Sequence, residues 1–146
     1  MLHYEDFSVG QVIPLGPFEV TREAIVAFAR EFDPQAFHLD EAAAKASVMG
    51  GLCASGWHSS AILVRMACDA YLNRSAAMGS NGFSEAKWLK PVYAGEVLRG
   101  TMTVLGRRVS ARRPEMGILE CRWESFNMAG ERKVELNGVN FMRVRG

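Results

Sequence analysis

The stretch FAREFDPQAFHLDEAAAKASVMGGLCASGWHSSAIL, residues 28–63, holds an acid, a histidine and a glycine at the start of a helix within one segment. Before the acid, the sequence predicts a helix capped by Thr21, with apolar residues at three- and four-residue steps: Ile25, Phe28, Ala29 and Phe32. Pro34 disfavours the helical conformation at Asp33. We therefore expect the helix to end near Phe32, with Asp33 at its exit.

A loop histidine and a second short helix follow the acid. Residues 34–37 are expected to form a loop that leads to His38. Asp40 is then predicted to be the N-cap of a helix over Glu41–Ala46, whose first turn contains an acid that interacts favourably with the helix dipole. Asp33 and His38 are thus both predicted to be loop residues held between two helices, a position where reacting groups are commonly found.

A third, longer helix is predicted over Cys53–Asn73, opening near Ser55 and Gly56. It is apolar on most sides, so we expect other elements to surround it. The first turn of a helix has free N–H groups, and Gly56 has no side chain to keep a ligand oxygen away from them.

The rest of the chain is predicted to be mainly strand. A strand is expected around residues 18–20, and residues 74–81 have the composition of a flexible connector. Two-residue alternation of apolar and polar side chains then predicts strands, with turns at 94–95 and 127–131: residues 83–89, 98–104, 119–124 and 132–144. No repeat or linker divides the chain, so we predict one domain over residues 1–146, of the α+β class, with an antiparallel sheet around the long helix.

Charge and cysteine content limit the possible partners. Lys and Arg total 17 against 16 Asp and Glu, so the balance favours neither nucleic acid nor a membrane surface. No apolar run approaches the roughly 20 residues of a spanning helix, and the first residues lack an export signal. The three cysteines, Cys53, Cys68 and Cys121, are widely spaced in apolar surroundings, which indicates reduced core residues and a cytoplasmic protein.

Three motifs, in this order, resemble the MaoC-like dehydratases, a family that includes the (R)-specific enoyl-CoA hydratases. They are DPQAFHLD at 33–40, GGL at 50–52 continuing to Ser55 and Gly56, and WLKPVYAGE at 88–96. The resemblance implies the hotdog fold, in which an antiparallel sheet wraps a long central helix. It also implies a homodimer or higher homo-oligomer with active sites at or near the subunit interface.

The resemblance assigns roles to four residues. Asp33 and His38 match the family's catalytic pair, which shares the proton transfers when water adds to a 2-enoyl thioester. Gly56 matches the glycine whose N–H holds the thioester oxygen, and Ser55 beside it belongs to the substrate-binding wall. Enclosure by Phe32 and Phe37 is expected to raise the pKa of Asp33. The implied substrate is an acyl-CoA thioester, and we expect neither a cofactor nor a metal site.

The chain departs from the family pattern at three places. Gln35-Ala36 stands where many members have Asn-Pro, and Ser55 stands where many have histidine. Val64 stands where some hydratases carry a serine, with Ser59 and Ser60 out of register. These departures bear on substrate choice more than on the type of reaction.

Other interpretations remain open at this point. An acid on the central helix would suit a hotdog thioesterase, and Asp69 is the only candidate, although it is expected to lie far from the helix start. A non-catalytic acyl-thioester-binding subunit is a further alternative. His58 is expected to be a core histidine with a satisfied hydrogen bond. Four arginines can hold coenzyme A phosphates or simply line a solvated loop: Arg107, Arg108, Arg112 and Arg113.

Overall fold

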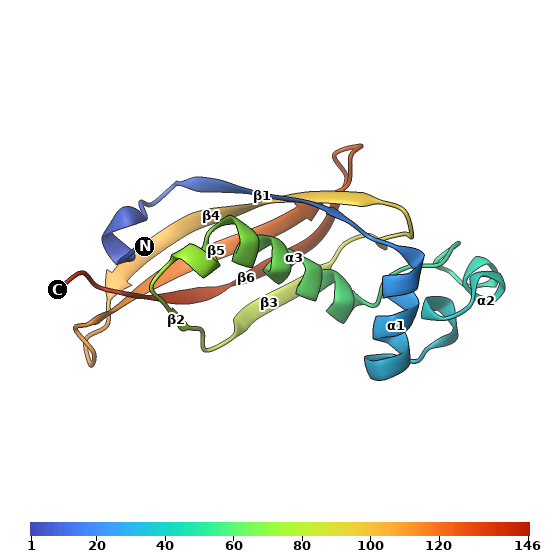
Figure 1. The fold of residues 1–146 in the computed structure, drawn as a ribbon, viewed down its shortest axis with the longest axis horizontal. Helices are drawn as coiled ribbons and strands as arrows, with labels where there is room; N and C mark the ends of the chain where they lie inside the picture. Colours follow the sequence, from blue (N-terminus) through green and yellow to red (C-terminus); the bar gives the residue numbers. More distant parts are fainter.

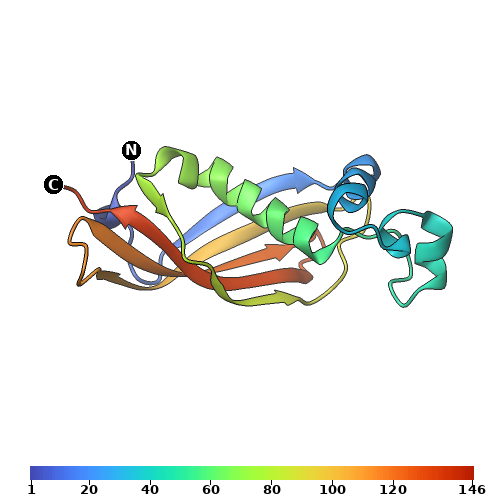
Figure 2. The ribbon, with the colours of Figure 1, turned by 90° about the horizontal axis from the view of Figure 1, so that it is seen from below.

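The computed structural model describes residues 1–146, which form an antiparallel sheet wrapped around one side of a long helix (Figures 1 and 2). The helix, α3, spans Gly56–Ala70. The strands follow the order β1-β4-β5-β6-β2, and β3 pairs with another part of β6. Their bounds are β1 Val12–Glu19, β2 Ala77–Gly79, β3 Phe83–Trp88, β4 Val97–Val109, β5 Met116–Phe126 and β6 Arg132–Arg143. The expected α+β hotdog architecture is confirmed.

Two shorter helices lie beyond one end of the sheet, next to the start of α3 (Figures 1 and 2). They are α1, Arg22–Phe32, and α2, Glu41–Ala46. Thr21 caps α1 by accepting a hydrogen bond from the Ala24 N–H at 3.1 Å, and Asp40 caps α2 in the same way. Both caps and both ends agree with the sequence prediction, because they depend on side chains close in the chain.

The core lies between α3 and the inner face of the sheet. Ile62, Leu63 and Met66 on α3 are buried against a layer of strand residues. That layer includes Leu98, Met102, Leu119, Leu136 and Met142. No helix of the structure combines the length and apolarity that crossing a membrane would require.

Several predicted boundaries are wrong. Three short 3-10 helices were not expected: Tyr4–Asp6, Ala36–His38 and Leu72–Arg74. His38 therefore lies in a helical turn, and the expected connector 74–81 contains strand β2. The first strand begins at Val12, well before residue 18. These elements are short or carry weak apolar patterns, so tertiary pairing decides them.

The expectation that α3 is covered on all sides is also wrong within this chain. Trp57 is 63% exposed and Val64 is 39% exposed, because the sheet covers only one side of the helix. All residues of β3 are exposed as well. The apolar character of α3 thus correctly predicts burial of one face. The opposite face carries an exposed apolar stripe that includes Trp57 and Val64.

A polar network crosses the core below α3. The Tyr71 hydroxyl donates to Asn140 Oδ1 at 2.8 Å and accepts from Trp123 Nε1 at 2.9 Å. Burial raises the pKa of Tyr71, so its hydroxyl stays protonated and keeps both bonds. This network joins the end of α3 to β5 and β6.

Tyr71→Phe is expected to lower the free energy of unfolding by about 1–3 kcal/mol, because it leaves the Trp123 N–H and the Asn140 carbonyl without a partner. Urea unfolding followed by far-UV circular dichroism measures the change. Tyr4→Phe is the matched control, because the Tyr4 hydroxyl makes no hydrogen bond and its loss should be nearly neutral. Equal losses in the two variants would show that the Tyr71 network does not stabilise the fold.

Candidate active site

A cavity of about 440 Å³ opens where α1, the start of α3 and residues 88–92 meet. Its lining includes Asp33, His38 and Gly56, three of the four residues singled out in the sequence. Ser55, the fourth, is fully buried directly behind Asp33 and does not line the cavity. The structure therefore brings all four predicted residues together at one end of the molecule.

His38 is oriented by the chain segment that leads into α3. Its Nδ1 donates a hydrogen bond to the Cys53 carbonyl at 2.7 Å. A carbonyl can only accept, so Nδ1 carries the proton of the neutral ring and Nε2 presents a lone pair. His38 is only 5% exposed, and its Nε2 lies 3.5 Å from Asp33 Oδ2. In its neutral form, the His38 ring is thus held with its basic nitrogen facing the carboxylate.

Asp33 is held by two side-chain donors. Ser55 Oγ donates to Oδ2 at 2.7 Å and Gln35 Nε2 donates to Oδ1 at 2.6 Å. The Ser55 bond, followed by the Gln35 bond, lowers the pKa of Asp33 and outweighs the opposing effect of burial; the charge of His38 lowers it further. The expected rise in this pKa is therefore wrong. Phe32 is 66% exposed and does not enclose the carboxylate.

Asp33 Oδ2 and His38 Nε2 are two hydrogen-bond acceptors that face each other. When His38 is neutral, its Nε2 lone pair and an ionised Asp33 are both acceptors and cannot bond each other directly. Their 3.5 Å separation suits a small donor such as water that contacts both. This arrangement can orient a water molecule and remove a proton from it.

Gly56 lies at the first turn of α3, and its backbone N–H donates to no carbonyl of the chain. A Cβ built on Gly56 would lie 2.5 Å from the Trp88 ring. Trp88 is fixed there by a hydrogen bond from its Nε1 to Ser60 Oγ at 3.0 Å. Glycine is therefore needed at this position for packing, and Gly56 also lines the cavity.

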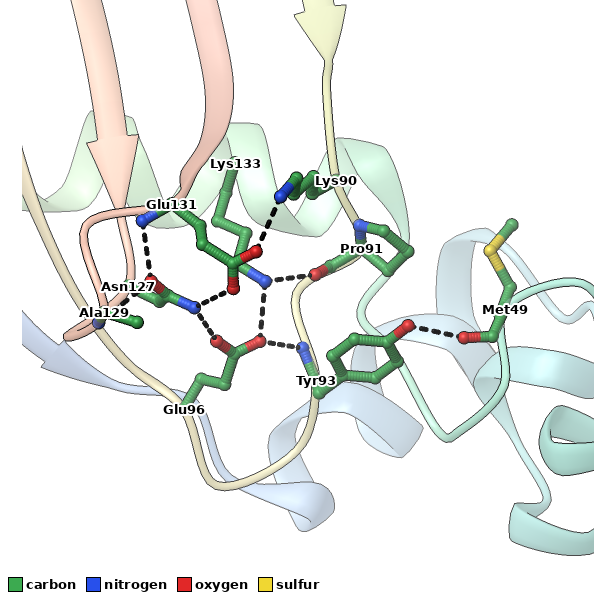
Figure 3. A network of polar contacts seen from close by, with 9 residues as sticks. All are labelled: Met49, Lys90, Pro91, Tyr93, Glu96, Asn127, Ala129, Glu131 and Lys133. Carbon is green, nitrogen blue, oxygen red and sulfur yellow. Dashed lines mark hydrogen bonds and ion pairs between the residues drawn. The ribbon is translucent and has the colours of Figure 1, made fainter.

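The 88–96 motif forms the opposite wall and is braced by a buried ion pair (Figure 3). Lys133 on β6 is 2% exposed and donates to the Pro91 carbonyl at 2.8 Å and to Glu96 at 3.0 Å. Burial opposes ionisation of Glu96, but hydrogen bonds from the Tyr93 N–H, Asn127 and Lys133 outweigh it and lower the pKa of Glu96. The wall is thus attached to β6 by the Lys133–Glu96 ion pair, in which both charged groups have hydrogen-bond partners.

Tyr93 joins this wall to the loop before α3. Its hydroxyl donates to the Met49 carbonyl at 2.5 Å, as Figure 3 shows. Met49 and the segment from Trp88 to Val92 all line the cavity. These walls were not predicted from the sequence, although the 88–96 motif was the signal that could have indicated them.

The other candidate residues lie outside this site. Asp69 forms an exposed ion pair with Arg65 at 3.0 Å, toward the far end of α3. Arg107 donates to the Phe7 carbonyl at 2.6 Å and lies over the Tyr4 ring, so it holds the first residues of the chain. The β4–β5 hairpin that carries the arginines lies near the two termini, at the end of the molecule opposite α1 (Figure 1).

His58 is buried beside the site without a complete set of partners. Its ring stacks on Phe28 with centroids 4.7 Å apart, and its Nδ1 has no hydrogen bond. The expectation of a satisfied core histidine is therefore wrong. Burial, with a smaller effect from the charge of His38, lowers the pKa of His58 and keeps it neutral.

A sheet wrapped around one helix, with an acid and a histidine facing a cavity at the start of that helix, defines a hotdog-fold protein. The MaoC like domain model matches residues 8–119. This protein belongs to the MaoC-like dehydratase family.

Solved structures agree with this membership. A MaoC-like dehydratase from Rhodospirillum rubrum is 37% identical, with a TM-score of 0.92 over 100% of this chain and 99% of that one. An (R)-hydratase from Pseudomonas aeruginosa shares the fold at 21% identity and a TM-score of 0.70, over 99% of this chain and 87% of that one. A 3R-hydroxyacyl-ACP dehydratase from Mycobacterium tuberculosis, solved as a complex, has a TM-score of 0.71 at 20% identity, over 91% and 96% of the two chains.

Two curated relatives were found by sequence. The uncharacterized protein YdeM of Bacillus subtilis is 29% identical over 123 residues, which cover 84% of this chain and 86% of YdeM. A mesaconyl-CoA hydratase of Cereibacter sphaeroides is 33% identical over 69 residues, which cover 47% of this chain and 19% of that enzyme.

Ser55→Ala is expected to raise the pKa of Asp33, because the Ser55 hydrogen bond is the largest influence that lowers it. The carboxyl group should then take up a proton at a higher pH, which a carbon-13 NMR titration of the Asp33 side chain measures. Ser60→Ala is the matched control, since its hydroxyl bonds Trp88 and not Asp33. An Asp33 titration that is the same in the Ser55 variant and the parent would contradict this assignment.

Proposed function

We propose that this protein is an (R)-specific hydratase/dehydratase that adds water reversibly to a 2-enoyl-CoA or a related unsaturated acyl thioester, giving a 3-hydroxyacyl thioester. Membership of the MaoC-like dehydratase family supports the type of reaction. The observation that carries the proposal is the His38 Nε2 lone pair facing the Asp33 carboxylate across 3.5 Å at the cavity wall. The (R) stereochemistry comes from the family resemblance.

The proposed hydration uses one water molecule held by Asp33 and His38. His38 Nε2 takes a proton from this water as the oxygen bonds to C3 of the enoyl thioester. The electron pair of the double bond moves toward the thioester carbonyl, and the Gly56 N–H stabilises the resulting enolate oxygen. Ionised Asp33 stabilises the imidazolium, which then returns its proton to C2 and restores the carbonyl. Dehydration is the reverse sequence.

Ser55 contributes to this mechanism as a positioning residue rather than as a substrate contact. Its hydroxyl donates to Asp33 Oδ2, and Ser55 itself does not line the cavity. The bond favours the ionised carboxylate, which is the form that can support the imidazolium. The earlier assignment of Ser55 to the substrate-binding wall is thus revised in this proposal.

Asp33→Asn and His38→Gln are each expected to lower kcat/KM for hydration of enoyl-CoA thioesters by about a hundredfold or more, because each removes a group that handles the proton. Loss of enoyl-thioester absorbance over a panel of chain lengths measures the rate. Asp40→Asn is the matched control, because asparagine still caps α2.

Unchanged hydration by both site variants, with their circular dichroism spectra intact, would refute the assignment. The alternatives give different products. A hotdog thioesterase would release free thiol, and a non-catalytic acyl-thioester-binding subunit would bind without turnover. The thioesterase alternative gains no support from the position of Asp69, whose carboxylate is paired with Arg65 on the helix surface.

We also propose that the chain acts as a homodimer or a higher homo-oligomer. All residues of β3 are exposed, and that strand pairs only with β6, so one of its edges is free. The exposed stripe of α3, with Trp57 and Val64, is also apolar. Free strand edges and contiguous apolar surface both favour association with another chain.

We further propose that residues 1–146 form one domain and that the protein acts in the cytoplasm. The three free cysteines would stay reduced in that compartment.

Val64→Glu is expected to shift the protein toward the monomer, because it places a charge in the apolar stripe of α3. Analytical ultracentrifugation across a concentration series measures the change in association. Val12→Glu introduces the same charge at a 55% exposed valine on β1, the opposite edge of the sheet, and should leave association unchanged. A purely monomeric parent protein would refute the proposed oligomer.

A further inference from the structure

One hydroxyl in the cavity has no partner in the chain. Ser59 lies on α3, one turn after the helix start, and lines the cavity although it is only 3% exposed. The hydroxyls of Ser55 and Ser60 are both engaged, with Asp33 and Trp88 respectively. Ser59 contributes its backbone N–H to the Ser55 carbonyl at 2.9 Å, but its hydroxyl makes no hydrogen bond.

This unpartnered hydroxyl is accessible from the cavity. The fully buried side-chain atoms without a partner are His58 Nδ1 and Ser125 Oγ, and Ser59 Oγ is not among them. The helix itself does not require a hydroxyl here, because alanine has a better helix propensity. In helices a serine hydroxyl commonly bonds the carbonyl four residues earlier, and Ser59 does not do so. A hydroxyl kept free at the wall of a cavity is suited to bind part of a ligand.

The surroundings of Ser59 limit the charge of that part. Apolar residues make up more than half of the cavity lining and include Ala54, Val92, Val134 and Trp88. Lys90 is the only lysine or arginine among the lining residues, and its Nζ is paired with Glu131 at 2.6 Å. No free cation is therefore available to offset a carboxylate buried beside Ser59. An uncharged oxygen fits these surroundings.

We propose that Ser59 is a specificity-determining residue whose hydroxyl binds an uncharged oxygen, such as an ether, hydroxyl or keto oxygen, on the acyl chain of the thioester substrate. This inference rests on the proposed function and adds the substrate class. The preferred substrates are oxygen-substituted enoyl thioesters rather than plain alkyl ones. The proposal also disfavours acyl chains that end in a carboxylate.

The test compares enoyl-CoA thioesters of equal length. One series is alkyl, one has an ether oxygen in place of a methylene at each successive chain position, and one ends in a carboxylate. The parent protein is expected to favour one ether position over the alkyl thioester by about tenfold or more in kcat/KM, as a neutral hydrogen bond to a buried hydroxyl predicts. Ser59→Ala is expected to lower the ether rate relative to the alkyl rate and so to remove that preference.

Ser125→Ala is the matched control. Its hydroxyl also makes no hydrogen bond, but Ser125 is fully buried and does not line the cavity, so the ether preference should persist. Calorimetric binding of the saturated alkyl and ether acyl-CoA pairs to the parent protein and to Ser59→Ala decides the inference without turnover. The same preference, lost in the variant, would support it.

The outcomes separate the two proposals. Hydration of all series with no ether preference, or with a preference that Ser59→Ala leaves intact, would overturn the role of Ser59 and leave the hydratase proposal standing. Ether-selective binding without hydration would support Ser59 and refute the hydratase proposal. A preference for the carboxylate series would overturn the uncharged class proposed for the ligand oxygen.

Discussion

The hydrogen bond from Ser55 to Asp33, 2.7 Å long, is the contact on which the candidate site depends. It joins the exit of α1 to the start of α3 across 22 positions of sequence. Ser55 occupies the N-cap position of α3, yet its hydroxyl does not cap the helix. Because the hydroxyl faces Asp33 instead, the first-turn N–H groups stay free while the carboxylate gains a donor. One side chain thus stabilises the ionised acid and leaves the helix start open for a ligand oxygen.

The histidine depends on the same short segment. His38 is oriented by the Cys53 carbonyl, two residues before Ser55. Asp33 and His38 are therefore both positioned by hydrogen bonds to the short segment Cys53–Ser55, and a shift of this segment would move both side chains. On the other side, the Lys133–Glu96 pair and the Tyr93–Met49 bond fix the second wall to the sheet and to the loop before α3 (Figure 3). Buried charges in that brace are tolerated because each has several hydrogen-bond partners.

Local chemistry made part of this arrangement predictable from sequence. The Thr21 and Asp40 caps, and the end of α1 before Pro34, depend on residues within a few positions of one another. The same holds for the proximity of Asp33 and His38, which are separated by a single short turn. The overall fold was predictable because long apolar and alternating patterns favour few architectures.

What could not be predicted depends on contacts between distant segments. The pKa of Asp33 moves down rather than up chiefly because Ser55, the N-cap residue of α3, donates to it, and this long-range contact could not be predicted from the local sequence; the smaller contribution comes from nearby Gln35. The open side of α3 could not be recognised either, since an apolar sequence does not say which of its sides the same chain covers. From the sequence, Ser59 was weighed only by its register against the family pattern, whereas the role proposed for it rests on the position of its unpartnered hydroxyl at the cavity wall.

Gly56 shows why a residue type alone cannot settle a role. The Trp88 ring lies 2.5 Å from the position of its missing Cβ, so packing by itself requires glycine here. That requirement and the proposed binding of an oxyanion are not competing explanations. Trp88 can lie over the first turn only if the side chain is absent, and once fixed there by Ser60 it forms the apolar wall beside the free Gly56 N–H. An N–H next to an apolar wall acts in a medium of low polarity, where its hydrogen bond to a developing negative charge is strengthened. Packing and the proposed chemistry therefore select the same glycine.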